Sequence, residues 1–239
     1  VSKIFKVGGA QAIAAMSLGT ETVPKVYKIF GPGNQFVTEA KIFAQKLGIA
    51  IDMPAGPSEV LVIADETANP SFIAADLLSQ AEHGADSQVV FLTISKEILE
   101  KVKQETESQL QDLPRKDIAE KALENSSFIL LNSIEECIEF SNEYAPEHLI
   151  LSIENPENIL SEITNAGSIF LGNYTPESAG DYASGTNHTL PTNGNARAYS
   201  GVSLDSFVKK ITIQRISEKG IQNLGKTIEK MAAEEGLFA

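Results

Sequence analysis

Two uninterrupted apolar runs, residues 60–63 and 89–92, constrain the fold of this chain more than any other feature. They consist of Val, Leu, Ile and Phe, which is typical of strands covered on both faces of a parallel sheet. Similar runs alternate with stretches of helical spacing, so the sequence predicts an α/β fold of layered, mainly parallel sheets with flanking helices. The expected strands are residues 25–30, 60–64, 88–93, 128–131, 149–153 and 168–171, and the expected helices are residues 10–18, 34–47, 70–83, 96–112, 116–125, 134–144 and 156–166.

The composition limits the classes of protein to which the chain can belong. Its 239 residues carry 19 Lys and Arg against 32 Asp and Glu, a net charge of −13, and 42% of them are hydrophobic. A hydrophobic core is therefore expected, whereas nucleic-acid binding, which needs clustered basic residues, is not. No apolar run approaches the roughly 18 residues of a membrane span, so we expect a cytoplasmic protein with no membrane partner. The single cysteine, Cys137, lies among carboxylates that oppose thiolate formation, so a packing role is expected.

Two segments depart from the regular alternation of strands and helices, and a helical stretch follows the second. Residues 52–58 contain two prolines and a glycine just before a strand, and they predict a crossover between domains. Residues 172–201 are rich in Gly, Asn, Ser and Thr, and a long irregular connection of this kind is usually functional. Residues 218–235 regain a helical pattern with an apolar stripe, which must be buried on this subunit or on another.

The three histidines, His83, His148 and His188, all lie next to carboxylate or amide side chains. For any one of them, a solvated surface pair is the simpler interpretation. Three such settings in a chain with three histidines favour a functional cluster.

A candidate metal site begins with Gln80 and His83. On the helix expected for residues 70–83 they are three residues apart and share one side of the last turn. A histidine near a helix end is also favoured by the helix dipole, so the pair alone is weak evidence. Zinc needs about four ligands, and the available further donors are Asp181 and His188 in the irregular segment.

Glu147 and His148 form a candidate acid/base pair at the entry of the strand expected for residues 149–153. Successive residues of an extended segment point in opposite directions, so one group could face each side of a reacting centre. A surface ion pair at the start of a strand is an equally good interpretation of this segment.

Two glycine-containing turns precede helices and could receive a phosphate. Residues 31–34, Gly-Pro-Gly-Asn, follow an expected strand, and Gly8 and Gly9 open the first expected helix. Neither matches the dinucleotide fingerprint, so a plain tight turn is the default interpretation of both. The residues by themselves indicate an α/β enzyme that binds a small anionic or metal-coordinating ligand.

Six segments of the sequence, taken together, indicate more about the function than any one of them does alone. In chain order they closely resemble the histidinol dehydrogenase family, and they are residues 7–14, 29–34, 52–60, 77–84, 144–149 and 180–192. The match spans nearly the whole chain. Because proteins of this family are substantially longer, the chain resembles the C-terminal half of a family member, and we expect it to be an excerpt of a longer polypeptide.

The resemblance implies oxidation of L-histidinol through an aldehyde to L-histidine, with two NAD⁺ reduced, in histidine biosynthesis. It implies that Glu147 and His148 are the catalytic acid/base pair, that His148 takes the alcohol proton, and that Glu147 activates a water. Zinc would be the metal cofactor and NAD the redox cofactor. The remaining residues that the resemblance assigns are Gln80, His83 and Asp181 as zinc ligands, Gln11 and Asn34 as NAD contacts, and Ser58, Gln80, His83, His148, Asp181 and Glu235 as substrate contacts, with His188 in a loop near the substrate.

The resemblance also implies an organisation in domains. Residues 1–59 would belong to a nucleotide-binding Rossmann-like domain and residues 60–202 to the zinc and catalytic α/β domain. Both of these domains would be Rossmann-like and incomplete in this chain. Residues 203–239 would form a C-terminal helical dimerisation segment. In the family a fourth zinc ligand follows this last segment, which is exchanged between the subunits of a homodimer. We therefore expect the isolated chain to bind zinc weakly and to have little activity.

Two other functions stay open from the sequence. The chain could be a catalytically inactive relative that acts as a ligand-binding or dimerisation module, which would bind zinc and histidinol without turnover. A zinc hydrolase on a similar fold is a weaker alternative, because the His-Glu-x-x-His pattern and the usual hydrolase ligand spacings are absent from the sequence.

Overall fold

The computed structural model describes residues 1–238 of the chain. By their internal contacts these residues form two units, Val1–Ser206 and a second unit that begins at Phe207, and each is described by itself. Within the described residues, no helix is both long and apolar enough to cross a membrane.

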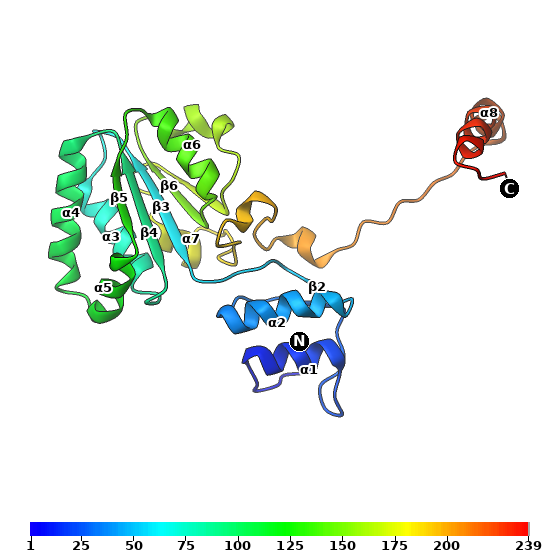
Figure 1. The fold of residues 1–239 in the computed structure, drawn as a ribbon, viewed down its shortest axis with the longest axis horizontal. Coiled ribbons are helices and arrows are strands. Elements are labelled where there is room, and N and C mark those ends of the chain that lie inside the picture. Colours follow the sequence, from blue (N-terminus) through cyan, green and yellow to red (C-terminus); the bar gives the residue numbers. More distant parts are fainter. Residues whose placement is uncertain (239) are drawn as a thin grey trace. The chain divides into compact units, whose positions relative to one another are not determined.

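The centre of the first unit is a parallel sheet of five strands in the order β5-β4-β3-β6-β7 (Figure 1). Every residue of the middle strand, β3, is buried, which agrees with its apolar run at residues 60–63. The strands are β3 at Glu59–Ala64, β4 at Gln88–Thr93, β5 at Ser127–Leu130, β6 at His148–Ser152 and β7 at Ser168–Leu171.

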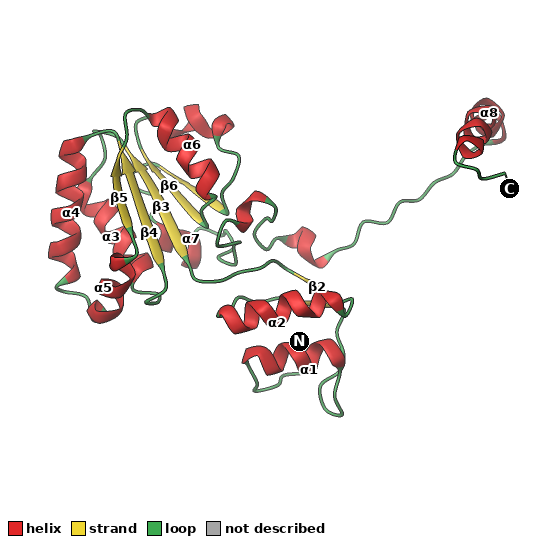
Figure 2. Ribbon diagram, in the orientation of Figure 1, coloured by secondary structure: helices red, strands yellow, loops and turns green. Residues whose placement is uncertain are grey.

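Helices cover both faces of this sheet (Figure 2). One face, with Val60 and Val62, packs against α3 (Pro70–Ala81), α4 (Lys96–Leu110) and α5 (Lys116–Glu124). The other face, with Leu61 and Ile63, packs against α6 (Ile134–Tyr144) and the 3₁₀ helix η1 (Pro156–Glu162). Side-chain caps fix where several of these helices begin, since Asn69, Ser95 and Ser133 each accept a hydrogen bond from a backbone N–H of the first turn.

The part of the first unit that precedes β3 contains α1 (Gly9–Leu18), β1 (Lys28–Ile29), α2 (Gln35–Lys46) and β2 (Ala50–Ile51). The two short strands pair in parallel. A buried ion pair between Lys41 and Asp52 lies under the turn after β1. Lys41 Nζ donates to the backbone oxygen of Gly31 at 2.8 Å, and Gly31 N donates to Asp52 Oδ2 at 2.7 Å.

Beyond β7 the chain forms the short helix α7 (Glu177–Tyr182) and the 3₁₀ helices η2 (Asn195–Arg197) and η3 (Leu204–Phe207). The second unit contains α8 (Glu218–Glu234), none of whose residues is buried. Its exposed apolar side chains are Ile221, Leu224, Ile228 and Met231.

The predicted α/β architecture of parallel strands with flanking helices is confirmed, with local corrections. The α-helix expected at residues 156–166 is a 3₁₀ helix that ends at Glu162, because Asn155, with φ of 54°, starts it in a left-handed conformation. The strand expected at residues 25–30 is reduced to two residues, and β2 was not expected. Within the irregular segment 172–201 the structure forms α7 and η2.

Candidate functional site

A cavity opens at the amino ends of the two central strands, β3 and β6. His148 is the first residue of β6 and pairs in register with Val60, the second residue of β3. The cavity has a volume of about 180 Å³, less than the roughly 300 Å³ at which drug-sized sites begin, so it suits a small substrate. Its lining includes Pro32, Ser58, His83, Glu147, His148, Asp181, His188, Thr189, Leu190 and Thr192.

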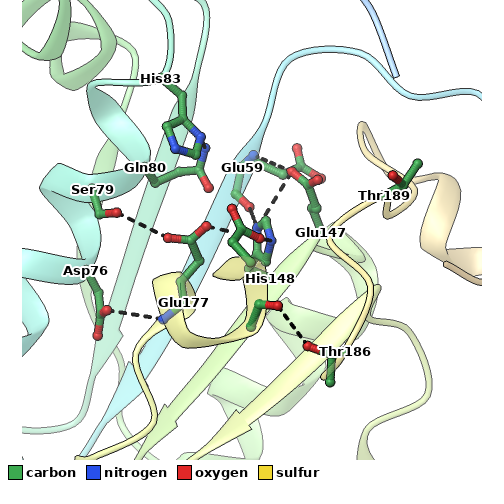
Figure 3. Close-up of polar contacts among 12 residues, drawn as sticks. Glu59, Asp76, Ser79, Gln80, His83, Glu147, His148, Glu177, Thr186 and Thr189 are labelled. Carbon is green, nitrogen blue, oxygen red and sulfur yellow. Dashed lines mark hydrogen bonds and ion pairs between the residues drawn. The ribbon is translucent and has the colours of Figure 1, made fainter. Parts of the chain in front are cut away.

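His148 is held by the backbone of β3 (Figure 3). Its Nδ1 lies 3.1 Å from the backbone oxygen of Glu59, and a carbonyl oxygen can only accept, so Nδ1 carries the hydrogen. Nε2 is then the basic nitrogen, and it lies 4.0 Å from Glu177 Oε1 and 4.0 Å from Asp181 Oδ1. Burial lowers the pKa of His148, so the imidazole is neutral near pH 7 and can accept a proton.

Glu147 is bound by the same residue of β3. Its Oε2 accepts a hydrogen bond from Glu59 N at 3.1 Å and lies 3.7 Å from His148 Nδ1. Both side chains line one cavity, although alternation along a strand suggested opposite sides. The pKa of Glu147 is raised to about 8, mainly by burial and in smaller part by the negative charges of Glu59, Asp181 and Glu177. A bound cation would favour the ionised carboxylate.

Gln80 and His83 meet across the turn that closes α3, in which His83 N donates to the backbone oxygen of Gln80 at 3.2 Å. The helix α3 ends at Ala81, so His83 lies beyond its C-cap residue, Glu82. Gln80 Nε2 nevertheless lies 3.3 Å from His83 Nδ1. Gln80 is fully buried, and its Oε1 has no hydrogen-bond partner, which is unfavourable for an isolated amide oxygen and favourable for one that binds a ligand.

The helix α7 brings two carboxylates to the same place. Glu177 and Asp181 are four residues apart on α7, and possible ligand atoms of His83, Glu177 and Asp181 all lie within 4.8 Å of one another. Glu177 Oε2 accepts from Ser79 Oγ at 3.2 Å (Figure 3). Its buried Oε1 has no hydrogen-bond partner and lies 4.0 Å from His148 Nε2. The pKa of Glu177 is raised to about 7, mainly by burial and next by the negative charge of Asp181.

Glu177 was missed by reasoning from the sequence. Its spacing of four residues before Asp181 was an available signal, but it became informative only once the segment was known to be helical.

The donors present fit a divalent metal ion. An amide oxygen, an imidazole and carboxylates are ligands that zinc accepts in proteins. Two of the oxygens, Gln80 Oε1 and Glu177 Oε1, are buried without a hydrogen-bond partner. A bound cation would give each of them a favourable contact. The structure brings His83 and Asp181, as expected, within ligand distance of each other and of Glu177, which was not expected. The assignment of Gln80 as a further ligand stays a prediction, supported by its unpartnered oxygen.

The other residues expected at the site lie in different places. Ser58 and His188 line the cavity, and Asn34 lines a neighbouring recess that shares Pro32, Ser58 and His83 with it. The side chain of Asn34 also caps α2, because it accepts from Val37 N at 3.2 Å. Gln11 lies on α1 and lines neither of these two hollows. Glu235 is the C-cap residue of α8 in the second unit.

Known proteins similar to this chain agree on one family. The sequence matches the family described as histidinol dehydrogenase over residues 1–239. The histidinol dehydrogenase of Bacteroides thetaiotaomicron is 62% identical over 239 residues, which cover 100% of this chain and 56% of that protein. For the histidinol dehydrogenase of Bacteroides fragilis the identity is 63%, with 100% of this chain and 56% of that protein covered.

The histidinol dehydrogenase from Elizabethkingia anophelis, in its crystal structure, has a fold similar to that of this chain. It has a TM-score of 0.97 and 68% sequence identity, and the match covers 100% of this chain and 55% of that one. The chain thus spans a little over half the length of the relatives it matches.

Proposed function

The chain belongs to the histidinol dehydrogenase family, and from this premise we propose that it carries the metal and acid/base site of an enzyme that oxidises L-histidinol through its aldehyde to L-histidine. The proposal concerns the whole protein, of which this chain is a part, acting in the cytoplasm in histidine biosynthesis. NAD, when bound, would accept the hydride in each of the two oxidations.

The convergence of Gln80, His83 and Asp181 beside Glu147 and His148 is the observation that carries the proposal. Gln80 lies on α3, His148 on β6 and Asp181 on α7, while His83 follows α3 and Glu147 immediately precedes β6. The cavity at the amino ends of β3 and β6 has His83, Glu147, His148 and Asp181 in its wall. One catalytic imidazole, one catalytic carboxyl group and a metal set are the groups that a two-step oxidation of an amino alcohol requires.

Gln80, His83 and Asp181 would hold the zinc. When bound, the ion would supply a fixed positive charge that orients the imidazole and amine of the substrate. The orphaned oxygen of Gln80 supports this role, because a ligand atom without the ion has no other partner. Glu177 faces the same set without being required as a ligand.

His148 would remove the proton from the substrate alcohol. Its hydrogen bond to the backbone oxygen of Glu59 leaves Nε2 free to act as the base. The neutral state favoured by burial also supports this role, since an imidazolium could not accept the proton.

Glu147 would serve the second oxidation by activating a water that adds to the aldehyde. Its carboxyl group lies against His148 and is oriented by the backbone N–H of Glu59. Its raised pKa makes it a better base than an exposed glutamate once it is ionised. No cysteine nucleophile is needed, and Cys137 is buried with its thiol pKa raised to about 11 by burial.

The remaining assignments complete the proposal. Ser58 and Glu235 would contact the substrate, with His188 near it, and Gln11 and Asn34 would contact NAD. The protein would be a homodimer in which the segment containing α8 is exchanged between subunits. The exposed apolar stripe of α8, with Ile221, Leu224, Ile228 and Met231, supports a partner for this helix.

The proposal is tested with the full-length protein that contains this chain. We expect histidinol-dependent reduction of two NAD⁺ per histidinol, loss of activity after zinc is removed by a chelator, and recovery when zinc is returned. Tight binding of zinc and histidinol without NADH formation would instead favour an inactive binding module. The isolated 239-residue chain serves as the comparison, and we expect it to bind zinc weakly and to turn over little substrate.

A further inference from the structure

Glu59 is the residue on which both proposed catalytic groups depend, and it does not line the cavity itself. Its backbone N–H donates to Glu147 Oε2 at 3.1 Å, and its backbone oxygen lies 3.1 Å from His148 Nδ1 (Figure 3). These contacts use main-chain atoms, so any residue at the start of β3 could make them. They therefore do not explain why a carboxyl group is buried at this position, where the residue is 7% exposed.

The side chain of Glu59 makes a separate set of contacts. Oε1 accepts from the backbone N–H of Asn193 at 3.0 Å, and Oε2 lies 3.3 Å from the hydroxyl of Tyr144. The same hydroxyl donates to Gln88 Oε1 at the shorter distance of 2.6 Å. The contact with Asn193 thus joins the first residue of β3 to a loop 134 residues later in the chain.

The loop that Glu59 reaches forms one wall of the cavity. Thr189, Leu190 and Thr192 line the cavity, and Thr192 Oγ1 accepts from Gly56 N at 2.6 Å. Asn193 and Gly194, the next two residues, have φ of 55° and 73°. Consecutive left-handed residues make a sharp turn, and the carboxyl group of Glu59 accepts the N–H of Asn193 at that turn. The carboxyl group of Glu59 therefore holds the end of this wall, next to the contact between Thr192 and Gly56.

We propose that Glu59 is a positioning residue whose side chain anchors the 189–194 loop. Because the backbone of the same residue binds Glu147 and His148, the wall of the cavity and the acid/base pair are both fixed in position by the start of β3. This inference rests on the proposed function for its kinetic consequence, although the anchoring itself does not. Glu59 acts through the loop rather than on the substrate.

The anchor role and a charge role can be separated by two substitutions. In Glu59→Gln the length of the side chain is kept, the amide oxygen still accepts from Asn193 N, and the amide group can donate to the Tyr144 hydroxyl oxygen. In Glu59→Asp the charge is kept, but the side chain is one methylene group shorter and falls short of Asn193. Anchoring predicts that Gln retains most of the function that Asp loses.

The test uses the full-length, zinc-loaded protein and two readouts. For Glu59→Asp we expect kcat for histidinol oxidation to fall on the order of 10- to 100-fold, because a wall displaced by about 1 Å misplaces the substrate. We expect an unchanged KM for NAD and faster amide hydrogen exchange in peptides covering residues 189–195. Glu59→Gln should recover most of kcat and of the exchange protection. Zinc content and thermal stability are measured on both variants.

Tyr144→Phe keeps the inference testable should Glu59→Asp fail to fold. It removes the contact to Oε2 but leaves the one to Asn193, so protection of residues 189–195 should match that of the wild type. A lowered kcat in Glu59→Gln together with a wild-type kcat in Glu59→Asp would overturn the anchor in favour of a charge role. Amide hydrogen exchange of residues 189–195 that is the same in all variants and in the wild type would also overturn the anchor. A wild-type protein that makes no NADH from histidinol would contradict the proposed function instead, and the exchange comparison would still decide the anchor.

Discussion

Nδ1 of His148 lies 3.1 Å from the backbone oxygen of Glu59, and this contact determines which nitrogen of the ring can act as a base. Because the carbonyl holds the hydrogen on Nδ1, the lone pair is on Nε2. Nε2 lies 4.0 Å from Asp181 Oδ1, on the side of the candidate metal set. The proposed base is thereby aimed at the place where a metal-bound substrate would present its alcohol.

Replacing His148 should separate catalysis from metal binding. In His148→Asn the side-chain amide can still donate to the backbone oxygen of Glu59, but no basic nitrogen remains. We expect histidinol oxidation by the full-length protein to fall roughly 10²- to 10⁴-fold with zinc content unchanged. His83→Asn, measured in parallel, should lose zinc as well as activity. Equal loss of zinc from both variants would mean that His148 is a ligand and not the base.

Glu177 should tune the affinity for the metal without being essential to it. Its carboxyl group lies within 4.8 Å of the ligand atoms of His83 and Asp181, so Glu177→Gln removes one negative charge that favours a divalent cation. We expect zinc affinity, measured by competition with a chelator, to fall roughly 10- to 100-fold. Glu82→Gln is the matched control, because Glu82 precedes His83 but lines a different hollow with Leu78 and Gln109. The same loss in both variants would show that the effect is one of general charge.

The central sheet could be predicted from the sequence because its strands have one physical solution. The apolar run at residues 60–63 is buried at every position, as is typical of a strand covered on both faces of a parallel sheet. The pair β1 and β2 could not be predicted in full, since each strand has two residues and exists through its pairing with the other. Residues 156–162 have the composition of an α-helix, but the left-handed Asn155 begins a tighter 3₁₀ helix.

The candidate site was predictable where residues adjacent in sequence carry the chemistry, as in Glu147 and His148. Glu177 was not, because its burial depends on the packing of α7 against α3, and its partner Ser79 is 98 residues away in the chain. Gln80 and His83 were expected to share the last turn of one helix, and they meet across the turn that closes α3, just beyond its last residue, Ala81. The spacing of three residues therefore indicated the right pair.

The carboxyl group of Asp76 should make stability depend on pH. Burial raises its pKa from 3.8 to about 6, so the folded state holds this proton more tightly than the unfolded chain. The stabilisation that the protonated Asp76 gives the folded state is complete below about pH 4 and is lost as pH rises through about 6. The change in the free energy of unfolding is at most about 3 kcal/mol.

Urea unfolding of Asp76→Asn in the full-length protein tests this. The variant keeps an acceptor for Glu177 N, which lies 3.4 Å from Asp76 Oδ1. Relative to the wild type it should gain stability as pH rises from 4 to 7, whereas the exposed Asp112→Asn should not. A difference between Asp76→Asn and the wild type that does not vary with pH would refute the assignment.

The buried ion pair of Lys41 and Asp52 should be needed for the turn at residues 31–34. Lys41→Met leaves the Asp52 carboxylate buried without its cation, which costs on the order of 3–5 kcal/mol. The turn should also loosen, because Lys41 Nζ no longer binds the oxygen of Gly31, and KM for NAD should rise. The exposed Lys46→Met on the same helix is the control, and adding Asp52→Leu to Lys41→Met should restore part of the stability. An unchanged unfolding midpoint in Lys41→Met would contradict the prediction.

Gly180 should not accept a side chain without a shift of its neighbours, because it packs against the ring of Phe170. A Cβ atom at Gly180 would be 2.6 Å and 2.8 Å from two ring carbons of Phe170, so the ring must move. The centroid of that ring is 5.9 Å from the centroid of His148, and Gly180 precedes Asp181. The displacement therefore reaches a proposed ligand and the proposed base together.

For Gly180→Ala we expect a loss of about 1–3 kcal/mol in stability and a lower kcat, measured by urea unfolding and NADH formation. Gly225→Ala, where no heavy atom lies within 4 Å, makes the same change in open space and should not destabilise the protein. Wild-type kcat and stability in Gly180→Ala would mean that Phe170 can move without disturbing either neighbour.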